Sequence, residues 1–417
     1  RVSAELAGSR RHHRTVTLFF EETMAKQVLT LNQISLKGLE RLPRDCYEIA
    51  SEFSLPDAIL LRSFKLQEKD IPGSVLAIAR AGAGVNNIPV AACSARGIPV
   101  FNSPGANANA VKELVATGLL LGSRGVIEGI DYVKTLGDLT DEAQLNKTLE
   151  AQKKQFKGSE LVGKTLGVVG LGAIGSLVAE MALTLGMDVV GFDPALSVEA
   201  AWRLSSQVRR ADTLSALFSR CDYISLHLPV LDSTRGLINA ELFSSMRAGT
   251  CLLNFARQEI VDEDGLLRAL DDGFLRKYIA DFPAPALIGR DDVILMPHIG
   301  ASTDEAEDNC AIMAADQLRD FLETGNIRHS VNFPTLQLDR DSGCRLSVTN
   351  ENVPKILGNV LSILADENIN VTDMLNKSRD EIAYNLIDIG SQPAVEVLNR
   401  MRSIEGVINV RLIGDCA

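Results

Sequence analysis

The stretch Leu166–Pro194, LGVVGLGAIGSLVAEMALTLGMDVVGFDP, is the part of the chain from which the rest can be interpreted. It begins with the short apolar run 166–169 and continues with the glycine pattern G-x-G-x-x-G. Apolar residues then recur at helical spacing, and a second β-rich run ends on Asp193. This order predicts a strand, a tight turn, a helix and a second parallel strand.

Each small or acidic residue in this unit has a role in a dinucleotide site. Gly170 permits a tight turn out of the strand, Gly172 lets the backbone approach a pyrophosphate, and Gly175 lets the helix pack on the strand. Asp193 can accept hydrogen bonds from the adenosine ribose, and no lysine or arginine follows before Arg203, which favours NAD over NADP. The glycines alone would also fit a βαβ crossover that binds no ligand. Because both strands, the helix and the acidic residue follow at the spacing of a dinucleotide site, an NAD site is favoured.

Length and composition limit the class of protein. The chain has 417 residues and a net charge of −12, which predicts two or three domains and argues against nucleic acid or an anionic membrane as a partner. No apolar run reaches the roughly 18–20 residues of a membrane span. The 7 cysteines are scattered without metal-ligand spacing and are typical of reduced thiols in the cytoplasm.

The N-terminal segment 1–23 contains RRHHR and no periodic pattern. The following MAKQVLTL resembles a natural start at Met24. We therefore predict a disordered N-terminal extension, with a basic targeting peptide as the alternative.

From Met24 onward, short β-rich runs alternate with helical ones, which predicts a doubly wound parallel sheet covered by helices. Two loops after predicted strands offer ligand-binding groups, because open α/β sheets bind ligands at the carboxyl ends of their strands. Arg62, Ser63 and Lys65 suit a phosphate, and Ala83 and Gly84 lie in a loop whose backbone N–H groups suit a carboxylate. The alternatives are solvated side chains and a simple turn. The predicted strands are 28–31, 47–50, 58–61, 76–80 and 100–102.

The same rhythm continues after Asp193, with predicted strands at 222–227, 251–255, 277–281 and 293–296. Each strand ends in residues able to bind a ligand or transfer a proton: His227-Leu228-Pro229, Ala256-Arg257, Asp281 and Pro297-His298-Ile299-Gly300. These residues are therefore expected on the sheet edge where the cofactor lies.

A nicotinamide cofactor implies hydride transfer, so the protein must hold the substrate and move one proton. His298 is the candidate base, and Arg257 can bind a carboxylate through its planar fork. Asp281 is a candidate for orienting the nicotinamide amide or the histidine. A hydrogen-bonded loop histidine and a structural ion pair are the alternatives.

The domain organisation follows from these patterns. A helical run at 304–322 returns the chain to the first domain, so we predict a discontinuous substrate domain, 24–122 with 307–335, around a Rossmann domain, 123–306. Residues 122–160 are predicted to be helical, and 327–334 to be an extended linker. The tail, 343–417, predicts βαββαβ, a small ferredoxin-like module.

Together these residues resemble the D-isomer-specific 2-hydroxyacid dehydrogenases, through VVGLGAIG, LHLPVLDSTRGLIN, LLNFARQEIVDE and MPHIGAST. Within that family the chain is similar to members that oxidise D-3-phosphoglycerate, the first step of L-serine biosynthesis, and carry a C-terminal ACT domain. The resemblance implies two doubly wound parallel-sheet domains, flavodoxin-like and Rossmann, plus the ACT module. It also implies NAD as cofactor and a homodimer or homotetramer.

The resemblance also implies roles for individual residues. Arg257 is the substrate-binding arginine and His298 the acid/base, with Asp281 beside them. Ala83 and Gly84 fall in the carboxylate loop, and Arg62, Ser63 and Lys65 where the family holds the substrate phosphate. The cofactor is implied to lie against Gly170, Gly172, Ala173, Ile174, Gly175, Asp193, Leu228, Pro229, Phe255, Ala256 and Asp281.

Two departures concern the catalytic residues. The family places a glutamate shortly after the aspartate to pair with the histidine, but here the run is Asp281-Phe282-Pro283-Ala284-Pro285. Three arrangements are possible: Asp281 alone is the acid partner of His298, another acid reaches His298 from elsewhere in the chain, or the histidine acts without a carboxylate partner. Gln258 also replaces the glycine usual after the arginine.

In the tail, the ACT resemblance implies L-serine binding between paired modules at Asn350, Asn352 and Asn370. Asn350 stands where a histidine is usual, and Lys355 where a glycine is usual. A purely structural dimerisation module is the alternative.

Two further functions stay open. One is a reductase of hydroxypyruvate, glyoxylate or 2-oxoglutarate, which would gain little from Arg62 and Lys65. The other is an NAD-sensing scaffold like the C-terminal-binding corepressors; the missing glutamate favours it, whereas the retained Arg257 and His298 do not.

Overall fold

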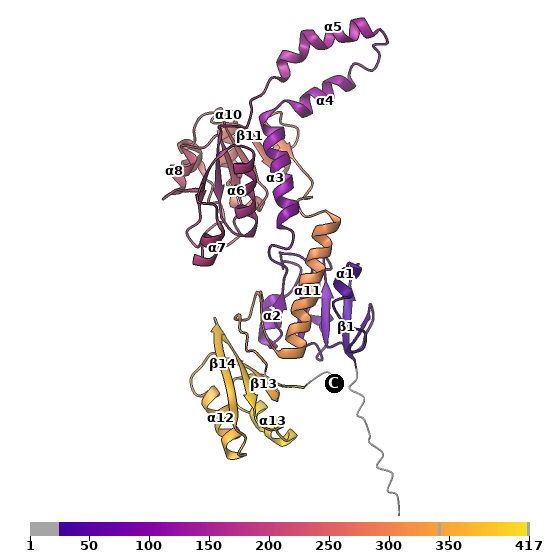
Figure 1. Cartoon of the computed structure of the whole chain (residues 1–417), viewed down its shortest axis with the longest axis vertical. Coiled ribbons are helices and arrows are strands. Elements are labelled where there is room, and N and C mark those ends of the chain that lie inside the picture. Colours follow the sequence, from indigo (N-terminus) through magenta and orange to yellow (C-terminus); the bar gives the residue numbers. More distant parts are fainter. Residues whose placement is uncertain (1–24, 341–342, 415–417) are drawn as a thin grey trace, which may run out of the picture.

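The computed structural model describes residues 25–340 and 343–414, arranged around three β-sheets along one long axis (Figure 1). The predicted N-terminal extension, 1–23, lies outside the described residues. Within the described ranges, no helix is both long and apolar enough to span a membrane.

The first sheet has five parallel strands in the order β2-β1-β3-β4-β5. Its central strands form because short β-rich runs such as AILL are buried on both faces. This is the flavodoxin-like order, in which the carboxyl ends of the strands share one ligand-binding edge. The strands are β1 (Lys26–Leu31), β2 (Tyr47–Ala50), β3 (Ala58–Leu61), β4 (Ala77–Arg80) and β5 (Val100–Phe101); the helices are α1 (Leu36–Leu39), η1 (Glu68–Asp70) and α2 (Val90–Ala95).

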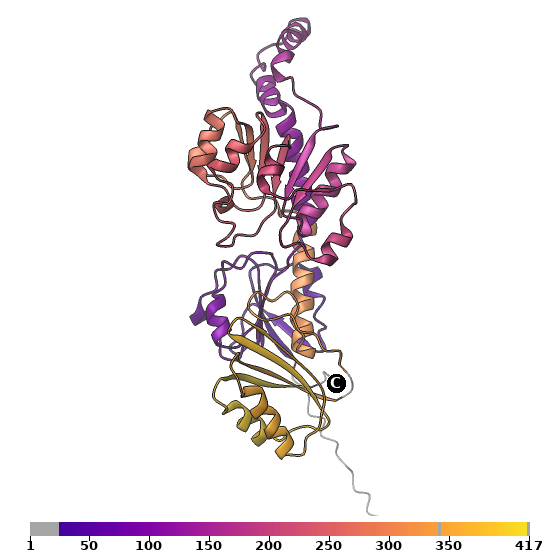
Figure 2. The same cartoon turned by 90° about the vertical axis from the view of Figure 1, so that its left-hand side faces the viewer.

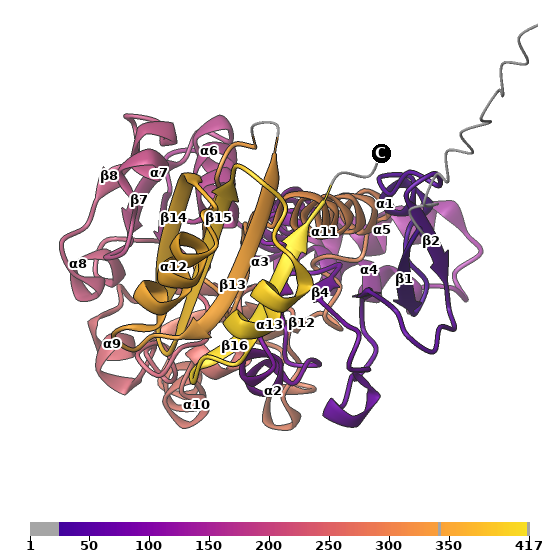
Figure 3. The ribbon, with the colours of Figure 1, turned by 90° about the horizontal axis from the view of Figure 1, so that it is seen from below.

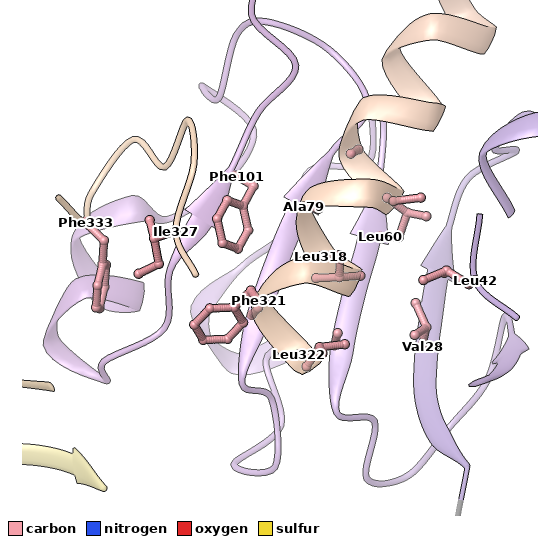
Figure 4. Close-up of a cluster of buried hydrophobic side chains, with 14 of the residues drawn as sticks. Val28, Leu42, Leu60, Ala79, Phe101, Leu318, Phe321, Leu322, Ile327 and Phe333 are labelled. Carbon is pink, nitrogen blue, oxygen red and sulfur yellow. The ribbon is translucent and has the colours of Figure 1, made fainter. Parts of the chain in front are cut away.

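One face of this sheet is covered by the long helix α11 (Asp304–Thr324), as Figure 4 shows. Its side chains Leu318, Phe321 and Leu322 are buried against the strands, and the rings of Phe321 and Phe101 are 5.8 Å apart. The helix begins at the Thr303 cap and ends at Gly325, which has the left-handed φ of 76° that stops a helix.

The second sheet has seven parallel strands in the order β12-β11-β10-β9-β6-β7-β8. This is the Rossmann order, with the glycine turn between β6 and α6. The elements are β6 (Thr165–Val169), α6 (Ala173–Thr184), β7 (Asp188–Phe192), α7 (Val198–Arg203), β8 (Arg209–Arg210), α8 (Leu214–Phe218), β9 (Tyr223–Leu226), α9 (Ala240–Ser245), β10 (Thr250–Asn254), η3 (Gln258–Ile260), α10 (Glu263–Asp271), β11 (Leu275–Ala280), η4 (Pro285–Leu287) and β12 (Val293–Leu295).

Helix α3 (Ala108–Ser123) connects the two parallel sheets but packs on the second. Val111, Val115 and Leu119 lie in one cluster with Val178 of α6 and other buried residues of the Rossmann sheet. The predicted boundary at 122/123 places α3 in the first domain. We propose instead that the boundary precedes α3, because its apolar face is buried in the second core.

Helices α4 (Val126–Lys134) and α5 (Glu142–Gln152), followed by η2 (Lys153–Phe156), project from the Rossmann sheet (Figure 1). Neither α4 nor α5 has a buried residue, and Ile130 and Val133 are exposed. The rings of Tyr132 and Phe156 are 5.4 Å apart, which ties α4 to η2.

The third sheet is antiparallel, in the order β14-β15-β13-β16, which together with α12 and α13 gives the βαββαβ fold. Alternate residues of β15 face opposite sides: Ile387 and Ile389 lie under α12 and α13, whereas Tyr384 and Leu386 join the core of the first sheet. Figure 3 shows the two helices on the outer face. The elements are β13 (Cys344–Glu351), α12 (Ile356–Asp366), β14 (Val371–Arg379), β15 (Ile382–Ile389), α13 (Val395–Arg402) and β16 (Val407–Ile413).

The segment between α11 and β13, predicted in part as an extended linker, is built into the core. Ile327, Phe333 and Leu336 are buried, and Ile327 forms an antiparallel bridge with Leu336. Arg379 of β14 donates to the Ser330 carbonyl. The C-terminal module is therefore packed directly against the first sheet (Figure 2).

Candidate active site

The glycine turn after β6 leaves open space where a pyrophosphate is expected. Gly170 has φ of 89°, and a Cβ on it would meet the His227 carbonyl oxygen at 2.5 Å. A Cβ on Gly175 would lie 1.9 Å from the Gly170 oxygen, so both glycines are needed for packing. A Cβ on Gly172 would meet nothing within 4 Å. The turn thus fits the phosphates of NAD, which need bare backbone at a helix N-terminus.

Asp193 closes this turn. Its carboxylate accepts hydrogen bonds from Leu171 N at 2.8 Å and from Ala195 N at 2.9 Å. Within the residues that the structure describes, no lysine or arginine forms an ion pair with Asp193. The carboxylate is therefore held at the end of β7, where it can accept bonds from ribose hydroxyls and would repel a 2′-phosphate.

The other predicted cofactor residues lie along the same sheet edge. Ala173 and Ile174 begin α6, and Phe255 and Ala256 are buried directly after β10. Leu228 packs at the border of the second core, and Pro229 is exposed. A Cβ on Gly105 would lie 2.9 Å from the Ala173 Cβ, so a loop of the first sheet closely approaches the glycine turn.

Arg257 extends from the Rossmann sheet to the predicted carboxylate loop. It follows β10, and its Nη1 donates to the Ala256 carbonyl at 2.7 Å. Its Nη2 lies 3.6 Å from the position of a Cβ on Gly84. Residues far apart in the sequence therefore meet here, and an arginine beside a glycine-rich loop can bind a carboxylate.

An arginine that the sequence analysis did not single out supports this loop. Arg80, the last residue of β4, donates from Nε to the Arg62 carbonyl at 2.9 Å and from Nη1 to the Gly84 carbonyl. Asn102 adds a bond to the Ala83 carbonyl at 2.6 Å. Burial lowers the pKa of Arg80 below its usual value. The signal in the sequence was an arginine at the end of an apolar strand, directly before glycines.

The predicted phosphate-binding residues lie in the neighbouring loop, which follows β3 and is joined to the Gly84 loop through Arg80. Arg62 Nη2 forms an ion pair with Glu307 Oε1 of α11 at 2.5 Å. Ser63 and Lys65 are exposed. Arg62 thus has an acidic neighbour that the sequence analysis did not predict.

His298 projects from the loop after β12 and is exposed. Its backbone has the left-handed φ of 58°. Its ring packs against Phe282, with ring centroids 4.8 Å apart, and within the described ranges no hydrogen bond or ion pair to its imidazole is found. Buried Asp281 accepts instead from Ile299 N at 2.8 Å and Gly300 N at 2.6 Å. Asp281 therefore holds the histidine loop and not the imidazole.

The predicted effector residues are not brought together within one chain. Asn350 is buried and accepts from Asn385, while Asn352 bonds the Asp380 carbonyl at the same end of the sheet. Asn370 precedes β14 at the opposite end, where its carbonyl accepts from Gly390 N. Only a second module could place an Asn370 beside Asn352.

Comparison with known proteins gives matches over most of the chain. The family "D-isomer specific 2-hydroxyacid dehydrogenase, NAD binding domain" matches residues 130–300. The D-3-phosphoglycerate dehydrogenase of Haemophilus influenzae is 35% identical over 343 residues, which are 79% of each chain. That of Escherichia coli K12 is 33% identical over 344 residues, again 79% of each chain.

Solved structures agree in fold. The NAD⁺-bound 3-phosphoglycerate dehydrogenase of Entamoeba histolytica superposes with a TM-score of 0.59 at 29% identity, covering 75% of this chain and 100% of that one. The holo D-mandelate dehydrogenase of Rhodotorula graminis gives 0.63 at 24% identity, covering 76% and 99%.

Proposed function

Because this chain belongs to the D-isomer-specific 2-hydroxyacid dehydrogenases, which use NAD, we propose that it oxidises D-3-phosphoglycerate to 3-phosphohydroxypyruvate, the first step of L-serine biosynthesis. The observation that carries the proposal is the approach of Arg257 to Gly84, whose carbonyl is joined through Arg80 to that of Arg62. One cation then faces the substrate carboxylate and another its phosphate.

In the proposed reaction, each of these residues has a separate role. Arg257 and the backbone of Ala83 and Gly84 hold the carboxylate and polarise the carbon beside it. His298 removes the hydroxyl proton as the hydride leaves that carbon. Bound NAD supplies the hydride acceptor, and it would be held by the turn at Gly170–Gly175 and by Asp193.

The phosphate end is assigned to Arg62, Ser63 and Lys65. Since Glu307 already pairs with Arg62, the phosphate must share or replace this carboxylate. A doubly charged phosphate competes well with one carboxylate for a guanidinium fork.

The test is the initial rate of NADH formation from D-3-phosphoglycerate and NAD with the product trapped. Arg62→Ala is expected to raise KM for this acid at least tenfold with little change in kcat. Arg41→Ala, which removes an exposed pair with Asp316 elsewhere on α11, serves as the control and should change neither. No turnover in the unaltered protein would reject the proposal.

The pairing of Arg62 with Glu307 also favours a second candidate, a reductase of unphosphorylated 2-oxo acids such as hydroxypyruvate, glyoxylate or 2-oxoglutarate. In that case Glu307 would neutralise a cation that the substrate does not need. NADH oxidation by these acids, unaffected by Arg62→Ala, would support it. A scaffold protein would instead lack turnover with every substrate, and His298→Asn would leave its partner binding unchanged.

For the C-terminal module we propose L-serine binding between two copies. The observation that supports it is the placement of Asn350 and Asn352 at one end of the sheet and Asn370 at the other. Pairing of β14, an exposed edge strand, would join two modules in a homodimer or homotetramer. Inhibition of turnover by millimolar L-serine, lost in Asn352→Ala and Asn370→Ala alike, would support it; turnover indifferent to serine would leave these residues structural.

A further inference from the structure

Phe282 packs against the ring of His298, for which the sequence offers no glutamate shortly after Asp281. It follows Asp281 at the end of β11, while His298 follows the neighbouring strand β12 and Arg257 the strand β10 on the other side. Its ring is therefore at the centre of three adjacent strand ends. It is half-buried, with the ring on the face of the loop that carries His298.

The ring contacts both groups to which the reaction is assigned. Its centroid is 4.8 Å from that of the His298 ring, with the two planes inclined by 53°. The Arg257 guanidinium carbon lies 5.9 Å from the same centroid. A tilted aromatic pair and a cation over a ring face are both attractive contacts with defined geometry.

Nothing else in the described ranges holds the imidazole. Asp281 uses one carboxylate oxygen for Ile299 N and the other for Gly300 N. These bonds hold the backbone next to His298, whose left-handed φ of 58° is uncommon for a residue with a side chain. Asp281 therefore holds the backbone of the histidine loop, whereas Phe282 contacts the imidazole ring.

We propose that Phe282 is a positioning residue that sets the orientation of His298 and its distance from Arg257, in place of the carboxylate that pairs with the histidine elsewhere in the family. The inference rests on the proposed function, since it assumes that these two residues act on one substrate. A small displacement of a proton-accepting group lowers the rate strongly, because proton transfer needs hydrogen-bond distance.

The experiment compares variants at position 282 under the assay described above. Phe282→Leu and Phe282→Met keep an apolar side chain without a ring, and we expect kcat to fall about tenfold and KM for the acid to rise about threefold. KM for NAD should stay within about twofold, because the glycine turn follows β6, which β10 and β9 separate from β11 in the sheet. Phe282→Tyr keeps the ring and should restore kcat to within about threefold of the unaltered protein.

Phe274→Leu is the matched control, since Phe274 is exposed on the turn before β11 and contacts neither catalytic group. Phe274→Leu should leave kcat, KM for the acid and KM for NAD unchanged. A general loss of folding would instead raise KM for NAD and lower the midpoint of thermal unfolding in the Leu and Met variants but not in Phe274→Leu.

Two outcomes separate this inference from the proposed function. If His298→Asn keeps its turnover, the assignment of the base is wrong, and the proposed mechanism fails with it. If His298→Asn is inactive while both Phe282→Leu and Phe282→Met turn over like the unaltered protein, the mechanism stands and the role of Phe282 is overturned.

Discussion

At the scale of single residues, His227 is the half-buried histidine whose titration should matter most for stability. It follows β9 below the glycine turn; its Nε2 lies 2.8 Å from Ser225 Oγ, and its inaccessible Nδ1 has no partner among the described residues. Burial lowers the pKa of His227 to about 3. In the unfolded chain it would titrate near 6.5.

Because the unfolded state binds the extra proton, stability is lost as the pH falls from about 6.5 towards about 3. Between pH 7 and pH 5 we expect the unaltered protein to lose roughly 1–2 kcal/mol more unfolding free energy than His227→Gln, which can still bond Ser225. Denaturant unfolding of both proteins at pH 7 and pH 5 measures this difference. The contributions of carboxylates cancel in it, because both proteins contain the same carboxylates. Equal losses would show that His227 does not titrate differently on folding.

Lys355 is a residue in a backbone conformation that suits glycine. It precedes α12 with φ of 79°, at the position where the resemblance led us to expect glycine. We expect Lys355→Gly to raise the unfolding free energy by up to about 1 kcal/mol, since glycine has no Cβ to strain there. Lys377→Gly, at an exposed position in β14, should instead lower it by about 0.5–1 kcal/mol, because strand glycine only adds unfolded-state entropy. Denaturant unfolding of the two variants measures these changes. A loss of unfolding free energy in Lys355→Gly would show that the lysine side chain contributes more than relief of the backbone conformation.

Site residues could be predicted where the sequence pattern itself carries the chemistry. Gly170, Gly172 and Asp193 were predicted because a turn with close backbone approach requires those residue types at that spacing. Arg80 and Phe282 were not, since an arginine ending a strand and a phenylalanine after an aspartate are ordinary until the fold places them beside Arg257. Contacts between strand ends depend on tertiary packing that local patterns do not contain.

At the scale of elements, α11 links the predicted phosphate-binding loop after β3 to the C-terminal module. Its first turns carry Glu307, paired with Arg62, and it runs roughly 30 Å to Thr324. Carbonyls at its C-terminal end accept bonds from the third sheet: those of Phe321 and Leu322 from Arg411, that of Thr324 from Arg345, and that of the Gly325 cap from Tyr384. Cations at a helix C-terminus also interact favourably with its dipole.

The same helix makes a close backbone contact that can be tested. A Cβ on Gly38 of α1 would lie 2.5 Å from the Cβ and 2.7 Å from the carbonyl carbon of Ala311. Since backbone atoms cannot yield as a flexible side chain does, Gly38→Ala should separate α1 from α11 and cost about 1–3 kcal/mol of unfolding free energy. Gly73→Ala, with nothing within 4 Å, is the control and should change stability by less than about 0.5 kcal/mol. Similar changes in unfolding free energy for the two variants would mean that α1 can move away from α11 without a loss of stability.

Strands and helices were predicted best where alternation or helical spacing was strong. The runs that became β3, β6 and β12 were identified with bounds close to those observed. The segment 327–334 was not, since an extended polar-rich stretch gives no sign that Ile327 and Phe333 are buried. β8 has only two residues, too few for a period to be seen.

At the scale of the whole molecule, Arg345 joins the C-terminal module to the rest. Its side chain is buried, with Nε 2.5 Å and Nη2 2.8 Å from the two Asp388 oxygens. It also donates to the carbonyls of Thr324, Leu338 and Asp339, each at 3.0 Å. One guanidinium therefore connects β13, β15, the end of α11 and the segment between them.

Removing this guanidinium leaves a largely buried carboxylate and three carbonyls without a donor, and no water can replace all of these bonds at once. We therefore expect Arg345→Met to lower the unfolding free energy by about 3–5 kcal/mol and to expose the segment before β13 to protease. Arg400→Met is the matched control: Arg400 also pairs with acids, Asp366 and Glu367, but is about half exposed, so its loss should cost less than about 1 kcal/mol. If the two variants unfold alike, the module is held mainly by the apolar contacts of Tyr384 and Leu386, and a Leu386→Ala variant should then show the larger loss.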